Sequence, residues 1–375
     1  MHYLDYAATT PVSREVAETM VAVMTNHFAN PSAQYEPGRK AKERTEQDRA
    51  VIATALGCKT NEVYFTSCST ESDNWAIRAA LHQNRHVGRH IITTAVEHSA
   101  VLQLMKVLES EGYAVTYLKP DKSGAVSAGQ VAEALREDTA LVSMMLVNNE
   151  TGAIFPVDEV AKLLKNRKVL LHTDAVQAFL KLPFTAKSLG ADYIALSAHK
   201  VGGPKGIGAL YIGGKARNTQ PLLYGGGQES GLRPGTEATA QIAGFAKAVA
   251  LRHEKLAEHI AHMSACRAYA VEKLTAIEDL RLISGDGAPH VLSVSLPGYP
   301  SQNIVSDLDS KGICISAGSA CHRGKASHVL VAMGLPKKVA AGTVRVSFGP
   351  ETSREDIDVL CDALLRHKTT RFPML

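Results

Sequence analysis

The stretch KVLLHTDAVQAFLKLPFTAKSLGADYIALSAHKVGGPKGIGALYIGG, residues 168–214, contains three short runs of mostly apolar residues. These runs are KVLLHTDA (168–175), DYIALSA (192–198) and GALYIGG (208–214). Runs this short and this apolar, rich in β-branched residues, are typical of strands buried on both faces of a sheet. We therefore expect this stretch to supply the middle of a sheet, with polar side chains and glycines at the strand ends.

The same pattern continues toward the N-terminus. A helical segment, TESDNWAIRAALHQ (70–83), follows the first of four further strand-like runs, which are EVYFTS (62–67), HIITTA (90–95), AVTYLK (114–119) and ALVSMMLV (140–147). Helix-like stretches separate several of these runs, and such alternation is typical of a mainly parallel sheet covered by helices on both faces. The sequence thus predicts an α/β fold.

The pattern changes after a glycine-rich segment at residues 222–238. Residues 241–277 are predicted to form one long helix, and shorter strands (HVLSVSLP, TVRVSFG) and helices complete the chain. We place a domain boundary within that helix, near residue 250. The two predicted domains are a large domain, 15–250, and a small domain made of 1–14 and 251–375.

Composition excludes several classes of function. The 375-residue chain is 45% hydrophobic and carries a formal charge of +4, without a long basic run and with only 5% aromatic residues, so we expect no direct nucleic acid binding. We find neither a signal peptide nor a membrane span and expect a soluble, cytoplasmic protein. The six cysteines are scattered and form no CxxC motif, which indicates reduced thiols and no metal site.

Ser69 and Thr70 follow a predicted strand and open a predicted helix. With Asp73 they fit a Thr-x-x-Asp capping pattern, which favours an ordinary helix cap. The same hydroxyls and the free N–H groups of the helix start would also hold a phosphate. The sequence leaves both interpretations open.

Lys200 follows another predicted strand and precedes glycine-rich backbone. A lysine in an apolar pocket can lose its proton and become a nucleophile, whereas a solvated lysine before a turn is the ordinary alternative. The glycines form neither a dinucleotide-binding fingerprint nor a P-loop, which argues against NAD enzymes and NTPases. Asp174 and Gln177 come after a very apolar strand, where the carboxylate either caps the turn or serves chemistry.

Further polar residues stand at other strand ends or within strands. His98 and Asn149 follow two predicted strands, and Arg345 lies inside an apolar one. A guanidinium there needs an anion, either from a structural salt bridge or from a substrate carboxylate. Cys321 lies between SAGSA and the basic stretch HRGK, where cations would favour its thiolate.

Lysine, aspartate, imidazole and a phosphate seat together match the needs of pyridoxal 5'-phosphate (PLP). The chain resembles the cysteine desulfurases of the NifS/IscS type, which are fold-type I PLP enzymes, over nearly its whole length. The motifs that carry the resemblance are YLDYAATTP, NPSA, STESDN, EHSAV, NNETG, TDAVQ, SAHKVGGPKGIGALY, RPGTEA and SAGSAC. The implied fold is a large domain with a mainly parallel mixed sheet between helices, plus a smaller α+β C-terminal domain.

The resemblance implies a role for each matching residue. Lys200 would form the Schiff base, Asp174 would pair with the pyridine nitrogen, and His98 would stack on the ring and assist proton transfer. Other cofactor contacts are implied for Ser69, Thr70, Ser197 and His199 at the phosphate, for Asn149 and Gln177 near the ring hydroxyl, and for Thr236 at the phosphate of a neighbouring subunit. Arg345, with Asn149 beside it, would hold the substrate carboxylate, and Cys321 would accept sulfur.

The implied reaction converts L-cysteine to L-alanine and leaves a persulfide on Cys321. A homodimer is implied, as is a sulfur-acceptor protein, whether an iron–sulfur scaffold, a tRNA-thiolation protein or part of another cofactor pathway. A selenocysteine lyase or a small aminotransferase on the same fold is the closest alternative. A non-catalytic protein that keeps the fold is the alternative from another class.

Overall fold

The strands predicted upstream of residue 215 form one seven-stranded sheet in the computed structural model, which describes residues 1–216, 218–317 and 327–373. The strand order is β2-β8-β7-β6-β5-β3-β4. Only β8 among them runs against its neighbours, β2 and β7, and the other neighbouring pairs are parallel. The strands are β2 (Val63–Thr66), β3 (His90–Thr94), β4 (Ala114–Leu118), β5 (Thr139–Ser143), β6 (Leu170–Asp174), β7 (Tyr193–Ser197) and β8 (Gly208–Ile212).

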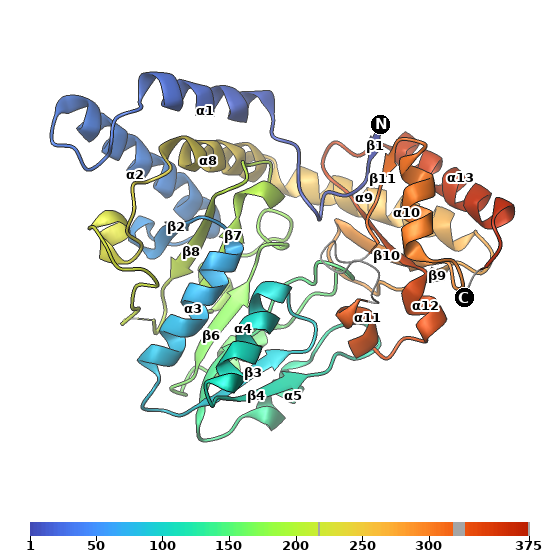
Figure 1. Ribbon diagram of the computed structural model, residues 1–375, viewed down its shortest axis with the longest axis horizontal. Coiled ribbons are helices and arrows are strands. Elements are labelled where there is room, and N and C mark those ends of the chain that lie inside the picture. Colours follow the sequence, from blue (N-terminus) through green and yellow to red (C-terminus); the bar gives the residue numbers. More distant parts are fainter. Residues whose placement is uncertain (217, 318–326, 374–375) are drawn as a thin grey trace.

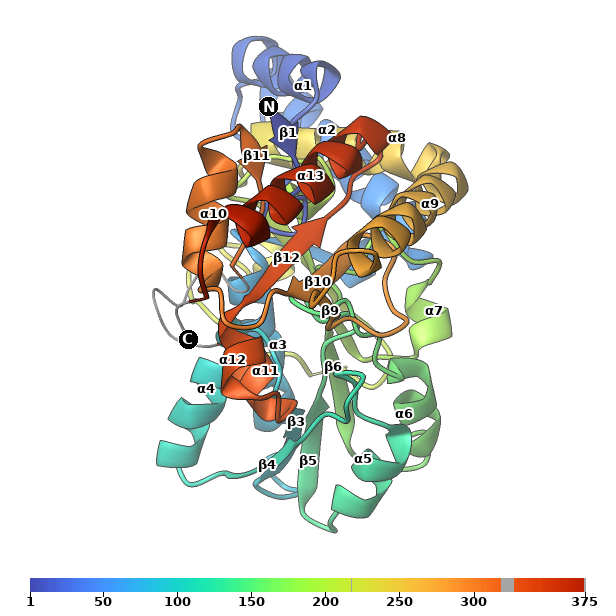
Figure 2. The ribbon, with the colours of Figure 1, turned by 90° about the vertical axis from the view of Figure 1, so that its right-hand side faces the viewer.

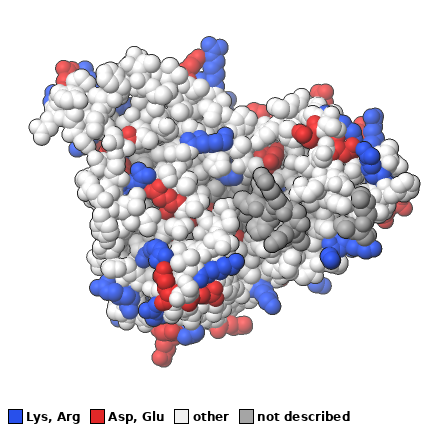
Figure 3. All heavy atoms as spheres, viewed as in Figure 1, with Lys and Arg blue, Asp and Glu red and all other residues white. Residues whose placement is uncertain are grey.

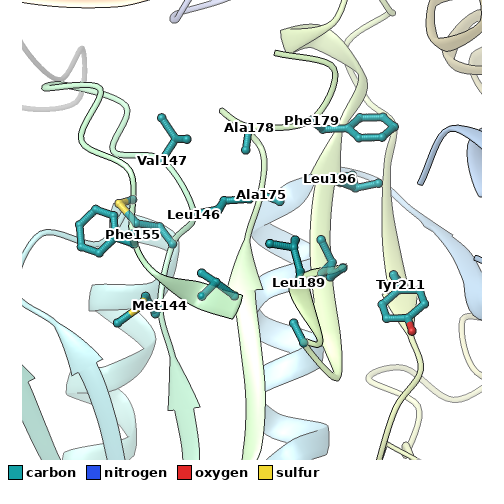
Figure 4. Packing of buried hydrophobic residues seen from close by; sticks show 14 of the residues in the cluster. Met144, Leu146, Val147, Phe155, Ala175, Ala178, Phe179, Leu189, Leu196 and Tyr211 are labelled. Atoms are coloured by element: carbon teal, nitrogen blue, oxygen red, sulfur yellow. The ribbon is translucent and has the colours of Figure 1, made fainter. Parts of the chain in front are cut away.

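Helices cover both faces of this sheet, with α3 and α4 on one side and α5 to α7 on the other (Figure 2). Successive residues of a strand point to opposite faces, so Leu170 packs toward α3 and α4 while Leu171 packs into the other core cluster. Figure 4 shows part of that second cluster, with Leu189, Leu196 and Tyr211 among its members. The helices of this half are α1 (Arg14–Asn26), α2 (Glu36–Leu56), α3 (Ser69–Gln83), α4 (Ser99–Ser110), α5 (Ala128–Ala134), α6 (Val157–Leu163), α7 (Ala186–Leu189) and α8 (Thr239–Glu254).

The C-terminal part of the chain lies beside the large sheet (Figure 1). Its strands β12, β10 and β9 form a separate three-stranded antiparallel sheet (Figure 2), and this part has its own hydrophobic cluster. The first strand of the chain joins this part, because β1 pairs with β11. The chain then crosses to α1, which packs on α8 beside the large sheet. The remaining elements are β1 (His2–Tyr3), β9 (Arg281–Leu282), β10 (Val291–Ser295), β11 (Ile313–Cys314), β12 (Thr343–Ser347), α9 (Leu256–Thr275), α10 (Ser301–Asp309), α11 (His328–Ala332), α12 (Lys337–Ala341) and α13 (Arg354–Thr370).

The single long helix predicted for residues 241–277 is wrong, because the segment forms α8 and α9 with a break at Lys255. Lys255 has φ −112° and ψ 23°, outside the helical region. The break allows α8 to pack on α1 and α2 while α9 packs on α13. The predicted α/β architecture with a mainly parallel mixed sheet is confirmed, whereas the boundary near residue 250 stays a prediction.

The distribution of charge and the hydropathy of the helices complete the description. Acidic and basic side chains are interspersed over the face seen in Figure 3. Among the described residues, no helix combines the length and the apolarity needed to cross a membrane.

Candidate active site

Five loops at one edge of the large sheet carry most of the predicted site residues. They follow β2, β3, β5, β6 and β7, which run in the same direction, so that their carboxyl ends meet at that edge. The residues placed there are Ser69 and Thr70 after β2, His98 after β3, Asn149 after β5, Asp174 and Gln177 at the end of β6, and Ser197, His199 and Lys200 at the end of β7.

Lys200 is the last residue of a short 3₁₀ turn, Ala198–Lys200, that continues β7. Its Nζ donates to the backbone oxygens of Ala7 and Ala8, each at 2.7 Å. Residues 5–10, which we call the N-terminal segment, therefore lie against the predicted Schiff-base lysine. Lys200 is thus partly buried and hydrogen-bonded to backbone rather than fully solvated.

Asp174 and His98 lie close to Lys200. Burial raises the pKa of Asp174, and the charges of His98 and Lys200 lower it. Burial lowers the pKa of His98, while Asp174 raises it and Lys200 lowers it. The three side chains therefore lie within electrostatic range of one another at the same sheet edge. The Nδ1 atom of His98 accepts the N–H of Ala100 at 3.2 Å, so the neutral ring carries its proton on Nε2.

The start of α3 has the geometry of an anion seat. Its cap residue is Cys68, whose side chain makes no capping hydrogen bond. The capping pattern suggested by the sequence does not form, because Asp73 is fully buried and its Oδ1 lies 3.2 Å from Nε2 of His172. The uncapped N–H groups, beside Ser69 and Thr70, therefore suit a phosphate.

Ser197 and Gly208 extend this seat toward Lys200. The Ser197 hydroxyl is buried and has no hydrogen-bond partner among the described residues. A Cβ atom on Gly208 would lie 2.7 Å from the oxygen of Leu196 and 2.9 Å from the carbonyl carbon of Cys68, so glycine allows β8 to lie close to the end of β7 on one side and to the residues after β2 on the other. An orphaned hydroxyl, an uncapped helix start and a nearby lysine fit the phosphate and the aldehyde of PLP.

His199, also predicted to bind phosphate, lies against the N-terminal segment. Its Nδ1 is 3.2 Å from Oγ1 of Thr9. Burial, followed by the charge of Lys200, lowers its pKa to about 3. The ring is therefore neutral at pH 7 and could only offer a neutral hydrogen bond to a phosphate.

The side chain of Gln177 is held by three buried hydrogen-bond partners. Its Nε2 donates to the oxygen of Ala7 at 2.9 Å, and its Oε1 accepts from Nζ of Lys181 at 3.4 Å and from Nε2 of His290 at 3.1 Å. Burial, aided by nearby cations, lowers the pKa of both Lys181 and His290 well below their ordinary values. Neither residue was predicted from the sequence, where each is one lysine or histidine among many.

Arg345 on β12 faces the large sheet from the C-terminal part. Its Nη1 donates to the oxygen of Asn149 at 2.9 Å, and its Nη2 donates to Oδ1 of Asp5 at 2.8 Å. The Nε atom is buried and has no partner among the described residues. The salt bridge, one of the two alternatives that the sequence left open, is present, and it does not use every donor of the guanidinium, so it does not exclude the substrate site.

Two predicted site residues are not placed against the others. Cys321 lies outside the described residues. The described chain before it is fixed by a backbone pair between Ser316 and Arg345, and the chain after it by the Ser327 hydroxyl, which donates to the buried carboxylate of Glu150. Thr236 is exposed on the segment before α8, as would suit a residue that serves a neighbouring subunit.

The chain is similar to known proteins over nearly its whole length. Residues 2–360 match the family model of the aminotransferase class V family. The chain is 42% identical to the cysteine desulfurase IscS of Methanosarcina thermophila over 363 residues, which cover 95% of this chain and 89% of that protein. A solved NifS-like protein has a TM-score of 0.92 at 36% identity, covering 98% of this chain and 99% of the other. The structure of SspA in complex with cysteine has a TM-score of 0.82 at 37% identity, covering 94% of this chain and 100% of the other.

Proposed function

The chain belongs to the aminotransferase class V family, and from this premise we propose which of its residues carry the reaction of a cysteine desulfurase. It is a PLP-dependent enzyme that takes sulfur from L-cysteine. The observation that carries the assignment is the meeting of Lys200, Asp174 and His98 at one sheet edge, within electrostatic range of one another, with Arg345 bonded to the oxygen of Asn149 at the same edge. These are the groups that an amino acid bound to PLP requires.

Each part of PLP has a counterpart in this chain. Lys200 would hold the aldehyde, Asp174 the ring nitrogen, and the start of α3 with Ser197 the phosphate. A positive ring nitrogen would favour the charged form of Asp174, whose pKa burial alone raises. When bound, PLP supplies an electron sink that makes the Cα proton of the amino acid removable.

Lys200 and His98 are the residues placed to move protons. Lys200 Nζ would remove the Cα proton of the substrate, after leaving the oxygens of Ala7 and Ala8. His98 is neutral at pH 7, because burial lowers its pKa, and it can donate from Nε2. The two groups can therefore act in sequence as base and acid.

Cys321 would accept the sulfur. Its thiolate attacks the substrate sulfur, forming an S–S bond as the substrate C–S bond breaks, and the product is a persulfide together with alanine. The described chain on the N-terminal side of Cys321 is bonded to Arg345, the residue proposed to hold the substrate carboxylate.

The protein's wider setting follows from the same proposal. We infer a homodimer, in which Thr236 completes the phosphate site of the partner. The persulfide would pass to an acceptor protein of an iron–sulfur cluster or another sulfur pathway. The five described cysteines are free thiols, which agrees with a cytoplasmic location.

The reaction can be tested by measuring alanine formed from L-cysteine and from L-selenocysteine. A desulfurase should form alanine from L-cysteine as well as from the selenium substrate, and Lys200→Ala should form none from either. Turnover of L-selenocysteine alone would instead identify a selenocysteine lyase. A protein that binds PLP and turns over neither substrate would support the non-catalytic alternative.

A further inference from the structure

Asp5 is the one acidic side chain of the N-terminal segment, and it stands where the two parts of the molecule meet. It lies in the motif YLDYAATTP, directly after β1, and its backbone forms a bridge with Ser347 of β12. The hydroxyl of Ser347 also accepts the N–H of Ala7 at 2.8 Å. The segment is thus fixed along β12, two residues from Arg345.

The alternating direction of the side chains along β12 explains why Arg345 contacts Asp5. Val344 and Val346 point into the hydrophobic cluster of the C-terminal part, so Arg345 and Ser347 point the opposite way, toward the N-terminal segment. The Arg345 side chain is 3% exposed and that of Asp5 is 19% exposed. A guanidinium so deeply buried needs a counter-charge, and Asp5 provides it at 2.8 Å.

We infer that Asp5 is a positioning residue for the substrate carboxylate site, acting through Arg345; this inference rests on the proposed function. Two contacts fix the plane of the guanidinium, one from Asn149 on the large-sheet side and one from Asp5. The Nε–H is left without a partner among the described residues, so its direction is set by the protein before any substrate arrives. A carboxylate is bound most specifically by such a preoriented planar fork.

Asp5 also balances the charge of Arg345. With a net charge near zero in the pair, recognition of the substrate depends on hydrogen-bond geometry more than on overall attraction. Among the described residues, loss of Asp5 leaves the guanidinium with one hydrogen bond, that to Asn149, about which its plane can turn. The affinity for the carboxylate should fall, while the cofactor contacts at Lys200 and Asp174 remain.

Two small amines test this role without turnover. L-alanine carries the carboxylate and ethylamine lacks it, and neither has a thiol. Calorimetry on the PLP-loaded protein measures the Kd of each. Asp5→Ala should raise the Kd of L-alanine roughly tenfold or more, the loss of a charge-assisted contact, and leave that of ethylamine within about twofold. Asp5→Asn keeps an acceptor oxygen and should restore the Kd of L-alanine to within about threefold.

A matched control for Asp5→Ala breaks a different ion pair that also involves a residue near the N-terminus. His2→Ala breaks the 2.8 Å contact with Asp356 and leaves Arg345 untouched, so its Kd for L-alanine should match the wild type. Should Asp5→Ala not fold, Asp5→Ser repeats the test with the same selective loss expected.

Three outcomes would overturn the inference. These are an unchanged Kd for L-alanine with a lower Tm, an equal loss for both amines, or an Asn variant as weak as the Ala variant. Failure of the proposed function can be told apart from failure of this inference. A wild-type protein that binds L-alanine but forms no alanine from L-cysteine would refute the proposed function, and the effect of Asp5→Ala on the Kd of L-alanine could still be measured.

Discussion

At the scale of single residues, Lys200 is distinguished by what holds it. Two carbonyl oxygens at 2.7 Å keep its amine at the sheet edge beside Asp174 and His98. These contacts come from a segment more than 190 residues away in the sequence, so they could not be foreseen from the motif SAHK alone. The motif predicted that Lys200 lies at a strand end, whereas its hydrogen-bond partners come from the tertiary fold.

Lys200→Ala should keep the fold and lose covalent retention of PLP. The side chain is only partly buried and lies outside the hydrophobic clusters, so packing should change little. Reduction with borohydride followed by mass spectrometry measures the bound cofactor. A pyridoxyl mass still found on the variant would assign the linkage to another amine.

Arg345→Lys should raise the KM for L-cysteine and leave the PLP absorbance unchanged. Lysine keeps the charge near Asp5 and loses the planar fork, which we expect to cost about 1.5–3 kcal/mol of substrate binding. Steady-state kinetics with a thermal melt of the same preparation checks this. An unchanged KM with a lower Tm would restrict Arg345 to a structural salt bridge.

Glu97 should make stability fall with rising pH. Burial raises its pKa to about 8 from 4.5, so the folded protein keeps a proton that the unfolded chain releases above pH 4.5. The contribution of Glu97 to the free energy of unfolding is therefore fully present below about pH 4.5. It decreases by roughly 1.4 kcal/mol per pH unit up to about pH 8. Between pH 6 and pH 8, Glu97→Gln should gain about 2–3 kcal/mol relative to the wild type in urea unfolding. Parallel pH profiles for the two proteins would contradict the raised pKa.

At the scale of elements, the sequence predicts the strands well and the starts and ends of the helices only in part. Apolar β-branched runs predicted all seven strands of the large sheet, because burial on both faces leaves little choice of residue. The start of α3 was ambiguous, since Thr70 and Asp73 fit a local cap and only the tertiary contact of Asp73 with His172 decides against it. The break at Lys255 has no glycine or proline to signal it.

Gly208 tests whether the close packing of β8 against its two neighbours, β2 and β7, builds the phosphate seat. Gly208→Ala places a Cβ atom within 3 Å of backbone atoms of Leu196 in β7 and of Cys68 after β2, so it should lower stability by about 1–3 kcal/mol and weaken PLP binding. Gly129→Ala is the control, because its Cβ atom would meet only Ser127 Oγ, at 3.6 Å. Urea unfolding and PLP titration follow both variants. A normal PLP affinity for Gly208→Ala would remove this element from the cofactor site.

At the scale of the whole molecule, the site joins segments from both ends of the chain. Asp5 and Arg345 are 340 residues apart, and Gln177 and His290 are 113 apart. A sequence motif identifies such residues singly, but their pairing depends on how the N-terminal segment runs between the two parts. For this reason Asp5, Lys181 and His290 were missed although Asp5 lies within a recognised motif.

The proposed homodimer can be tested by mixing two defective variants. Thr236→Ala should weaken PLP binding in a protein that still sediments as a dimer, because the hydroxyl would serve the partner subunit. After subunit exchange with Lys200→Ala, one site per mixed dimer has both Lys200 and Thr236, and PLP affinity should return for that site. Mixtures that behave as the sum of the two variants would place Thr236 outside the partner's site.

The role of Cys321 as sulfur acceptor is tested most directly by mass spectrometry after a single turnover with L-cysteine. The peptide that carries Cys321 should gain one sulfur atom in the wild type and in a Cys314→Ser variant, which is needed because both cysteines can share a peptide. Cys321→Ser should still bind L-cysteine and should gain no sulfur, since a serine hydroxyl is not ionised near neutral pH. Normal alanine formation by Cys321→Ser, or a persulfide found only on another cysteine, would contradict the account.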